Sequence, residues 1–186
     1  MKKTITSVII AMFLVGTLFI MHANSSAKAQ QEIKEINMLT RFMDQIFDNI
    51  KVMHRLSHDM KREAEPFKSP RHRARYRFAP NDNNPRNIMV KARNCMSIFK
   101  TVNGILSHSA LDNRRIIFND INATLDSIST FGRRGIRAIS DNNYALYLAS
   151  AHGVETEVAI LNELLNELQF AINITIYESD MSKESL

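Results

Sequence analysis

Two long stretches of this chain carry apolar side chains at alternating three- and four-residue steps. This spacing places the side chains on one face of an α-helix, which can then be buried. The first stretch begins at Ile36, ends at Met60 and is interrupted only by Ser57, so it predicts a helix over residues 32–64. Three further apolar residues widen its stripe: Phe42, Phe47 and Leu56. A stripe of that width suits a helical bundle better than a two-stranded coiled coil.

The second stretch begins at Tyr144, ends at Ile172 and keeps its phase across Gly153. An unbroken phase predicts one helix of about 40 residues, because a glycine inside a helix costs only about 1 kcal/mol. Asp141 precedes this helix and is of a residue type that caps helix N-termini. A break of the helix at Gly153 is the competing interpretation.

A shorter helix is predicted to open at Asn84-Pro85. Asparagine is a favoured N-cap, and proline is favoured at the first helical position because its missing N–H group would have no partner there. Apolar residues continue at helical spacing, and we expect the helix to end near Ser107. These residues are Met89, Ala92, Met96, Phe99 and Leu106.

A second short helix is predicted after Ser109 and Asp112, whose spacing resembles a capping box. Its apolar positions end at Phe131, before Gly132 and Gly135, where we expect the helix to stop. A short turn between the two shorter helices forces them to be antiparallel. No segment alternates β-branched residues between turn signals. The predicted fold is therefore all-α, an elongated antiparallel helical bundle with two long and two shorter helices.

Residues 1–29 have the pattern of a signal peptide. Lys2 and Lys3 precede the apolar segment 5–21, and Ala27-Lys28-Ala29 provides the small residues that a signal peptidase requires. The pattern predicts an exported protein at the periplasm or cell surface of a Gram-negative bacterium, with residues 30–186 forming one bundle domain. The alternative is a retained membrane anchor, because about 17 apolar residues lie near the lower limit for spanning a bilayer.

Charge is distributed unevenly along the chain. The formal net charge of +5 falls to +2 without residues 1–29, which hold three lysines and no acidic residue. Residues 51–100 carry a net charge of +9, whereas residues 141–186 carry −7. Without residues 1–29 the chain is therefore a strong charge dipole along its sequence.

The basic segment centres on a loop predicted at residues 65–84, which contains Pro66, Pro70 and Pro80. Arginine occupies every second position within it, at Arg71, Arg73, Arg75 and Arg77, with Tyr76 between the last two. In an extended chain the four guanidinium groups would share one edge, and Tyr76 would lie on the other. Such an edge could bind phosphate or carboxylate groups.

Several interpretations of the basic loop stay open. A solvated loop is the simplest, and pairing within the chain is next, with acidic partners Glu155, Glu157, Glu163 and Glu167. Exposed pairs of this kind contribute about 1 kcal/mol or less. An acidic protein or a membrane surface is a further partner, and nucleic acid is the least favoured.

Motifs for catalysis are absent from the sequence, which has no GxSxG elbow, no phosphate-binding glycine loop and no Cys-x-x-Cys pair. His54 and His58 are four residues apart, but no glutamate completes a zinc-protease motif and no third ligand is evident. We expect partly buried, hydrogen-bonded histidines there. Cys95 is predicted to be a buried thiol, with an intermolecular disulfide as the alternative. We therefore predict a protein without enzymatic activity, cofactor or metal site.

Three segments carry a resemblance to a known family: the leader end "AKAQ", the following "QEIKEINMLTRFMDQIFDNIKVMHRL" and the closing "VETEVAILNELLNEL". In outline the chain resembles the exported helical, minor-pilus type components of conjugative type IV secretion systems, of the kind on Bacteroidetes conjugative transposons. The resemblance implies a role in adhesion and assembly, with other envelope or secretion-apparatus proteins as partners. It supplies no catalytic residues and has no counterpart of the arginine strip. A homo-oligomer and a free exported binding protein are the alternatives.

Overall fold

The described part of the computed structural model comprises residues 38, 40–106 and 115–184. The chain divides into two compact units, Met1–Arg41 and Phe42–Leu186, and nearly all described residues belong to the second. The predicted signal peptide and the capping-box residues Ser109 and Asp112 lie outside the described residues. Within those described, no helix is long and apolar enough to cross a membrane.

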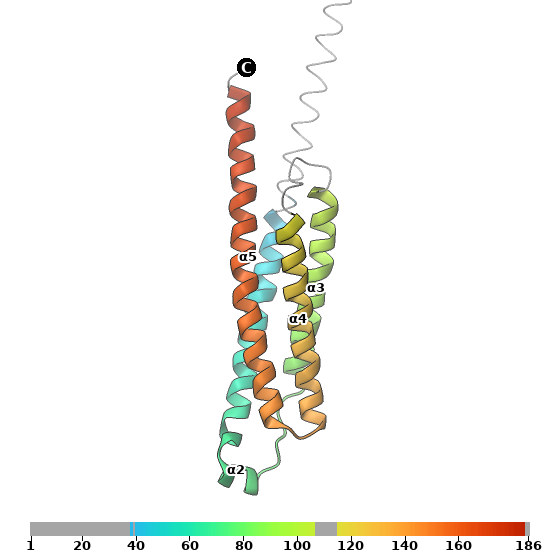
Figure 1. Cartoon of the computed structure of the whole chain (residues 1–186), viewed down its shortest axis with the longest axis vertical. Helices are drawn as coiled ribbons and strands as arrows, with labels where there is room; N and C mark the ends of the chain where they lie inside the picture. The colour runs from blue at the N-terminus through green and yellow to red at the C-terminus, as the bar shows by residue number, and fades with distance from the viewer. Residues whose placement is uncertain (1–37, 39, 107–114, 185–186) are drawn as a thin grey trace, which may run out of the picture. The chain divides into compact units, whose positions relative to one another are not determined.

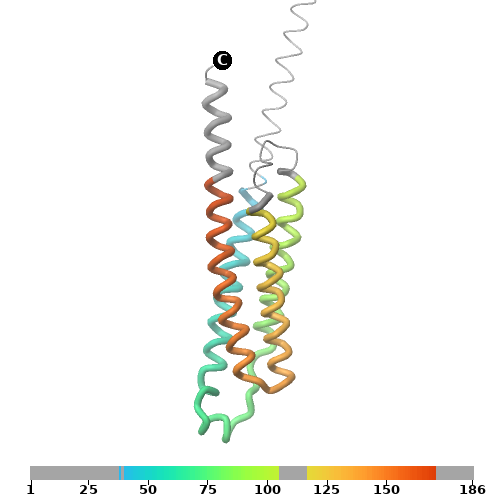
Figure 2. The backbone as a smooth tube through the Cα atoms, in the orientation of Figure 1, coloured from blue at the N-terminus to red at the C-terminus, as the bar shows by residue number. Residues whose placement is uncertain are grey.

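The described residues form helices and no strand, which confirms the predicted all-α fold class. The first helix covers residues 40–64. The elements that follow are η1 (Glu65–Lys68), α2 (Pro70–Arg75), α3 (Asn83–Leu106), α4 (Arg115–Ser140) and α5 (Tyr144–Glu184). Figure 1 shows that α4 runs antiparallel to α3 and that α5 runs antiparallel to α4. Figure 2 shows the first helix beside them, descending toward α2.

Apolar residues predicted from the helical periodicity form the core. Each fully buried Leu, Ile or Met side chain stabilises the fold by about 1.5–3 kcal/mol relative to exposure. The first helix contributes Met43, Ile46, Ile50, Met53 and Met60, and α5 contributes Tyr147, Ala151, Val154, Val158, Leu161, Leu165 and Leu168. Ser57 is also buried, and its hydroxyl donates a hydrogen bond of 2.7 Å to the carbonyl of His54. The Ser57 hydroxyl, which interrupts the apolar stripe, thus has its hydrogen-bond partner within its own helix.

Helix α5 is continuous over 41 residues, so the alternative of a break at Gly153 is wrong. A Cβ atom at this position would overlap the ring of Phe131, which α4 places directly over the glycine. Gly153 is therefore a packing residue, and the apolar stripe on both sides outweighs its low helix propensity.

The predicted N-cap of α5 is wrong by two residues. The Oδ1 atom of Asn143, not the carboxylate of Asp141, accepts a hydrogen bond of 2.9 Å from the backbone N–H of Leu146. The Asp141 carboxylate instead accepts from Nε of Arg137 at 3.3 Å. Asn142, between them, adopts a left-handed backbone with φ of 50°, which asparagine tolerates better than most residues.

Helix α3 begins at Asn83, one residue before the predicted cap, and ends at Leu106 as the sequence indicated. The backbone N–H of Asn83 donates to Oδ1 of Asn81 at 3.0 Å. Asn84 is buried and its side chain contacts another helix, so it is not available as a cap. The cap moves upstream because a second asparagine can supply the same oxygen.

The predicted stop of α4 at Gly132 and Gly135 is wrong, because the helix continues to Ser140. Both glycines are buried against other helices. A Cβ atom on Gly132 would lie 3.0 Å from the carbonyl oxygen of Pro85, and one on Gly135 would lie 3.0 Å from Cε of Met60. The absence of side chains lets α4 approach its neighbours closely, and this contact outweighs the poor helix propensity of glycine.

Three helices meet at the carboxylate of Glu63. The hydroxyl of Tyr147 on α5 donates to Oε2 of Glu63 at 2.7 Å. The side-chain amide of Asn84 on α3 donates to Oε1 of the same carboxylate at 3.1 Å. Burial, followed by the contact with Glu63, raises the pKa of Tyr147 far above its ordinary value, so this hydroxyl stays a donor.

Alanine substitutions at Gly132 and Gly104 form a matched pair that tests the close approach of α4 to α3. A Cβ atom at Gly104 meets nothing within 4 Å, so Gly104→Ala should stabilise the protein by about 0.5–1 kcal/mol. At Gly132 the same methyl group must displace backbone atoms of α3, so the free energy of unfolding should fall by about 1–2 kcal/mol. Urea denaturation measures both changes, and equal stability of the two variants would contradict the packing described.

Tyr147→Phe tests the contribution of the carboxylate contact. Removal of the hydroxyl leaves Glu63 with one of its two donors, so we expect a loss of about 1.5–3 kcal/mol in the free energy of unfolding. Tyr76→Phe removes an exposed hydroxyl and serves as the control, with an expected change within about 0.5 kcal/mol. Similar small changes in both variants would show that the buried contact contributes little.

Candidate functional site

The arginine segment folds into short helical elements. Pro66 is the second residue of η1 and Pro70 is the first residue of α2, positions in the first turn where a fixed φ angle favours helix initiation. Arg71, Arg73 and Arg75 consequently lie on a helix, in which residues two apart point in nearly opposite directions. The extended strip suggested by the sequence is thus wrong for this part of the loop.

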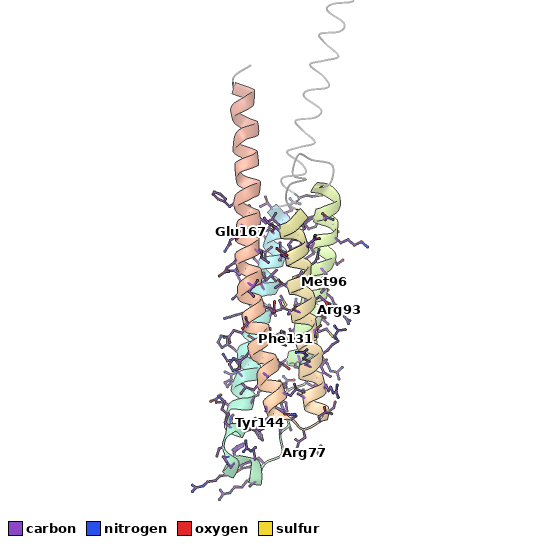
Figure 3. The ribbon with its side chains drawn as sticks, in the orientation of Figure 1. Arg77, Arg93, Met96, Phe131, Tyr144 and Glu167 are labelled. Atoms are coloured by element: carbon purple, nitrogen blue, oxygen red, sulfur yellow. The ribbon has the colours of Figure 1, made fainter. Side chains whose placement is uncertain are left out.

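Arg73 joins α2 to the start of α5. Its Nη1 atom donates to the carbonyl of Phe67 at 3.1 Å and to the hydroxyl of Tyr144. The guanidinium carbon also lies 5.0 Å from the centre of the Tyr144 ring. Figure 3 shows Tyr144 and Arg77 both toward the α2 end of the bundle. These contacts make Arg73 a positioning residue rather than one free to bind a partner.

A row of aromatic rings connects the arginine segment to the core. Phe78 is 6% exposed, and its ring centre lies 5.3 Å from that of Tyr147. The ring centre of Phe67 lies 5.0 Å from that of Phe78. The ring centre of His72 lies 4.7 Å from that of Phe67. Tyr76 stacks on His72 at 4.6 Å. The segment is therefore packed, which argues against an unstructured solvated loop.

All four arginines of the segment are exposed. Arg73 is held by the contacts described above, so the arginines available to a partner are Arg71, Arg75 and Arg77. Tyr76 between them is 59% exposed, and we refer to these three arginines and Tyr76 as the basic tip. Helix α2, which carries Arg71 and Arg75, lies at one end of the bundle, beyond the other helices (Figure 1). Among the described residues, none of the ion pairs joins these arginines to an acidic side chain.

Pairing of the arginines with the acidic C-terminal region, one of the alternatives that the sequence left open, is not observed for Glu155. Its carboxylate is bound instead by Nζ of Lys61, at 2.8 Å. This hydrogen bond is the main reason that the pKa of Glu155 is lowered. The carboxylate is therefore ionised at neutral pH and is already neutralised by a residue of the first helix.

The same carboxylate lies beside the two histidines singled out in the sequence. His54, His58 and Glu155 each offer one metal-ligating atom, and these atoms lie within 4.8 Å of one another. The sequence offered no third ligand, because Glu155 is 97 residues away from His58 and only the packing of α5 on the first helix brings them together. Both histidines are exposed, not partly buried as predicted.

The Cys95 thiol is not an activated nucleophile. The thiol is buried, as predicted, and burial raises its pKa to about 12 despite a hydrogen bond with Asn49. A protonated, inaccessible thiol is neither a nucleophile nor a ready disulfide partner. A nearby surface groove of about 500 Å³ is lined by Gln45, Asp48, Asn49, Asn94, Ser97 and Ile98. Four of these six residues carry an amide or hydroxyl group, and the lining holds no acid–base pair for catalysis.

Comparisons with protein-family models, with curated proteins and with solved structures find no match. The resemblance to conjugative pilus components therefore stays a prediction from the sequence. Function must be inferred from the exposed chemistry of the chain itself. The basic tip is the clearest such feature, because it combines charge, an aromatic side chain and a defined conformation.

Tyr144→Ala tests whether Arg73 holds the basic tip in place. The substitution removes a cation–π contact of about 1 kcal/mol, which corresponds to about fivefold more frequent local opening. Trypsin should therefore cleave after Arg71, Arg75 and Arg77 about fivefold faster, measured by mass spectrometry of the early fragments. Phe170→Ala is the control, because it removes an exposed ring of α5 that lies outside the aromatic row and the arginine segment. Equal cleavage in the wild type and Tyr144→Ala would exclude the anchoring role.

Proposed function

We propose that this protein is a non-enzymatic assembly subunit of the bacterial cell envelope, which docks onto an acidic surface of a partner protein through its basic tip. The observation that carries the proposal is the exposure of Arg71, Arg75, Arg77 and Tyr76 on a packed, anchored segment. Arginine and tyrosine are enriched among the residues that dominate binding energy at protein interfaces.

The anchoring of the basic tip supports docking over solvation. A mobile arginine loop loses conformational entropy when it binds, at about 0.5–1.5 kcal/mol for each immobilised side chain. Here the backbone is already fixed by the Arg73 contacts and by the aromatic row from Phe78 to Tyr76. Such preorganisation reduces the cost of ordering and favours a specific partner.

The envelope location is inferred from the signal-peptide pattern of residues 1–29. Within the envelope, DNA-transfer machinery of the conjugative type is the assembly that the sequence resemblance favours. The partners would then be other secretion-channel or pilus proteins. This role requires no catalytic residue, in agreement with the inert Cys95.

A second candidate function is that of a free periplasmic or secreted protein that binds anionic lipid, polysaccharide or nucleic acid. Guanidinium groups favour it, because they bind phosphate as readily as carboxylate. The two functions differ in fractionation. An assembly subunit remains with a large membrane complex, whereas a free binder is released by osmotic shock as a small species.

Arg71→Ser, Arg75→Ser and Arg77→Ser, combined in one variant, test the docking function. The variant and the wild type carry a C-terminal tag, are crosslinked in envelopes of the native host and are captured for mass spectrometry. We expect several secretion-channel proteins in fixed proportion with the wild type, and at least about tenfold less of them with the variant. The change leaves Arg73 and the aromatic row intact, so the fold should be retained.

A control variant replaces three exposed cations away from the basic tip by serine: Arg55, Arg93 and Lys100. It lowers the net charge by the same amount as the arginine variant. If capture depended on net charge alone, both variants would therefore recover equally reduced amounts of the partners. Equal recovery of partners from the wild type and the arginine variant would refute docking by the basic tip. Recovery of the protein alone would refute the assembly role.

A further inference from the structure

A cluster of histidine and carboxylate groups lies on the side of the bundle, on the first helix and α5. Nε2 of His58 is 3.5 Å from Oε1 of Glu155, and the ring centres of His54 and His58 are 4.7 Å apart. We propose that His54, His58 and Glu155 bind a divalent transition-metal ion, with Zn²⁺ as the first candidate. This inference does not depend on the docking role of the basic tip.

The residue types and spacing fit a zinc site. Histidines four apart on a helix lie on the same face, so one ion can bind both. Tetrahedral ligands at about 2.0–2.1 Å from Zn²⁺ are about 3.4 Å apart. The separation of 3.5 Å between His58 and Glu155 already matches such an edge. The largest separation in the cluster is within 4.8 Å, so a small rotation of exposed side chains completes the geometry.

His152 is positioned to supply a fourth ligand. It precedes Glu155 by three residues on α5, and its Nδ1 atom lies 3.7 Å from Oε2 of that carboxylate. Its ring is exposed, like those of His54 and His58, and so is free to turn toward the ion. Without it, water would fill the fourth position and leave an open coordination site.

Lys61 is the group that opposes metal binding. Its ammonium lies 2.8 Å from Oε2 of Glu155 and competes with the ion for the same charge. The two carboxylate oxygens have different neighbours: Oε1 faces His58 and Oε2 faces Lys61. Loss of the Lys61 charge should therefore strengthen metal binding, because one cation no longer repels the other.

Bound metal would link the first helix to α5. Because the unfolded chain does not hold these three ligands together, the ion stabilises the folded state in proportion to its affinity. Thermal stability should therefore rise with the concentration of Zn²⁺.

The test uses the full-length chain with a tag that contains no histidine. Isothermal titration with ZnCl₂ should give one equivalent of binding, and Co²⁺ should give the visible absorption of a tetrahedral site. His54→Gln, His58→Gln and Glu155→Gln should each weaken binding at least about tenfold. These side chains are exposed or half-buried, so the variants should fold, which circular dichroism checks.

His72→Gln is the matched control, because it also removes one imidazole ring, here a half-buried one, but lies on α2. Its affinity for Zn²⁺ should equal that of the wild type, whereas Lys61→Gln should bind more tightly. Absence of a stoichiometric Zn²⁺ site in the wild type would overturn the proposal. Equal weakening in His72→Gln and His54→Gln would overturn it too, since this result indicates general binding to surface histidines.

Discussion

The carboxylate of Glu63 is the group on which the arrangement of the helices depends most. It accepts hydrogen bonds from Tyr147 on α5 and Asn84 on α3, so one side chain fixes three helices relative to one another. Apolar contacts alone tolerate sliding of one helix along another, but a buried polar group is satisfied in one register only. The ring of Tyr147 also contacts Phe78, so the same residue that sets the register supports the aromatic row beneath the basic tip.

Much of the fold follows from the spacing of apolar residues, because burial of one helix face dominates the energy and repeats with the helical period. The length of α5 was predicted for this reason, since its apolar residues stay in phase from Tyr144 onward. The end of α4 was predicted wrongly, because a glycine that ends a helix and one that permits close packing look alike in a sequence. The difference lies in the neighbour, here Pro85, which α3 brings against Gly132.

The candidate sites were harder to predict from the sequence than the fold. Alternating arginines indicate a shared edge only if the backbone is extended, and Pro70 starts a helix there instead. The carboxylate beside His58 comes from α5, and no local pattern in either segment specifies that contact. The residue types were recognisable in each case, whereas the backbone conformation and the long-range neighbours were not. The buried state of Cys95 was predictable, because it lies on an apolar helix face.

The row of rings from Tyr147 to Tyr76 has a spectroscopic consequence. The chain contains no tryptophan and four tyrosines, so its intrinsic fluorescence comes from tyrosine. Tyr76 belongs to the basic tip and Tyr144 contacts Arg73 of the same segment. The emission of Tyr147 is open to quenching by the carboxylate that accepts its hydrogen bond. The end of the bundle that carries the exposed arginines thus contains intrinsic fluorophores. Binding of a partner there should change the tyrosine fluorescence of the protein, so no added dye is needed to detect it.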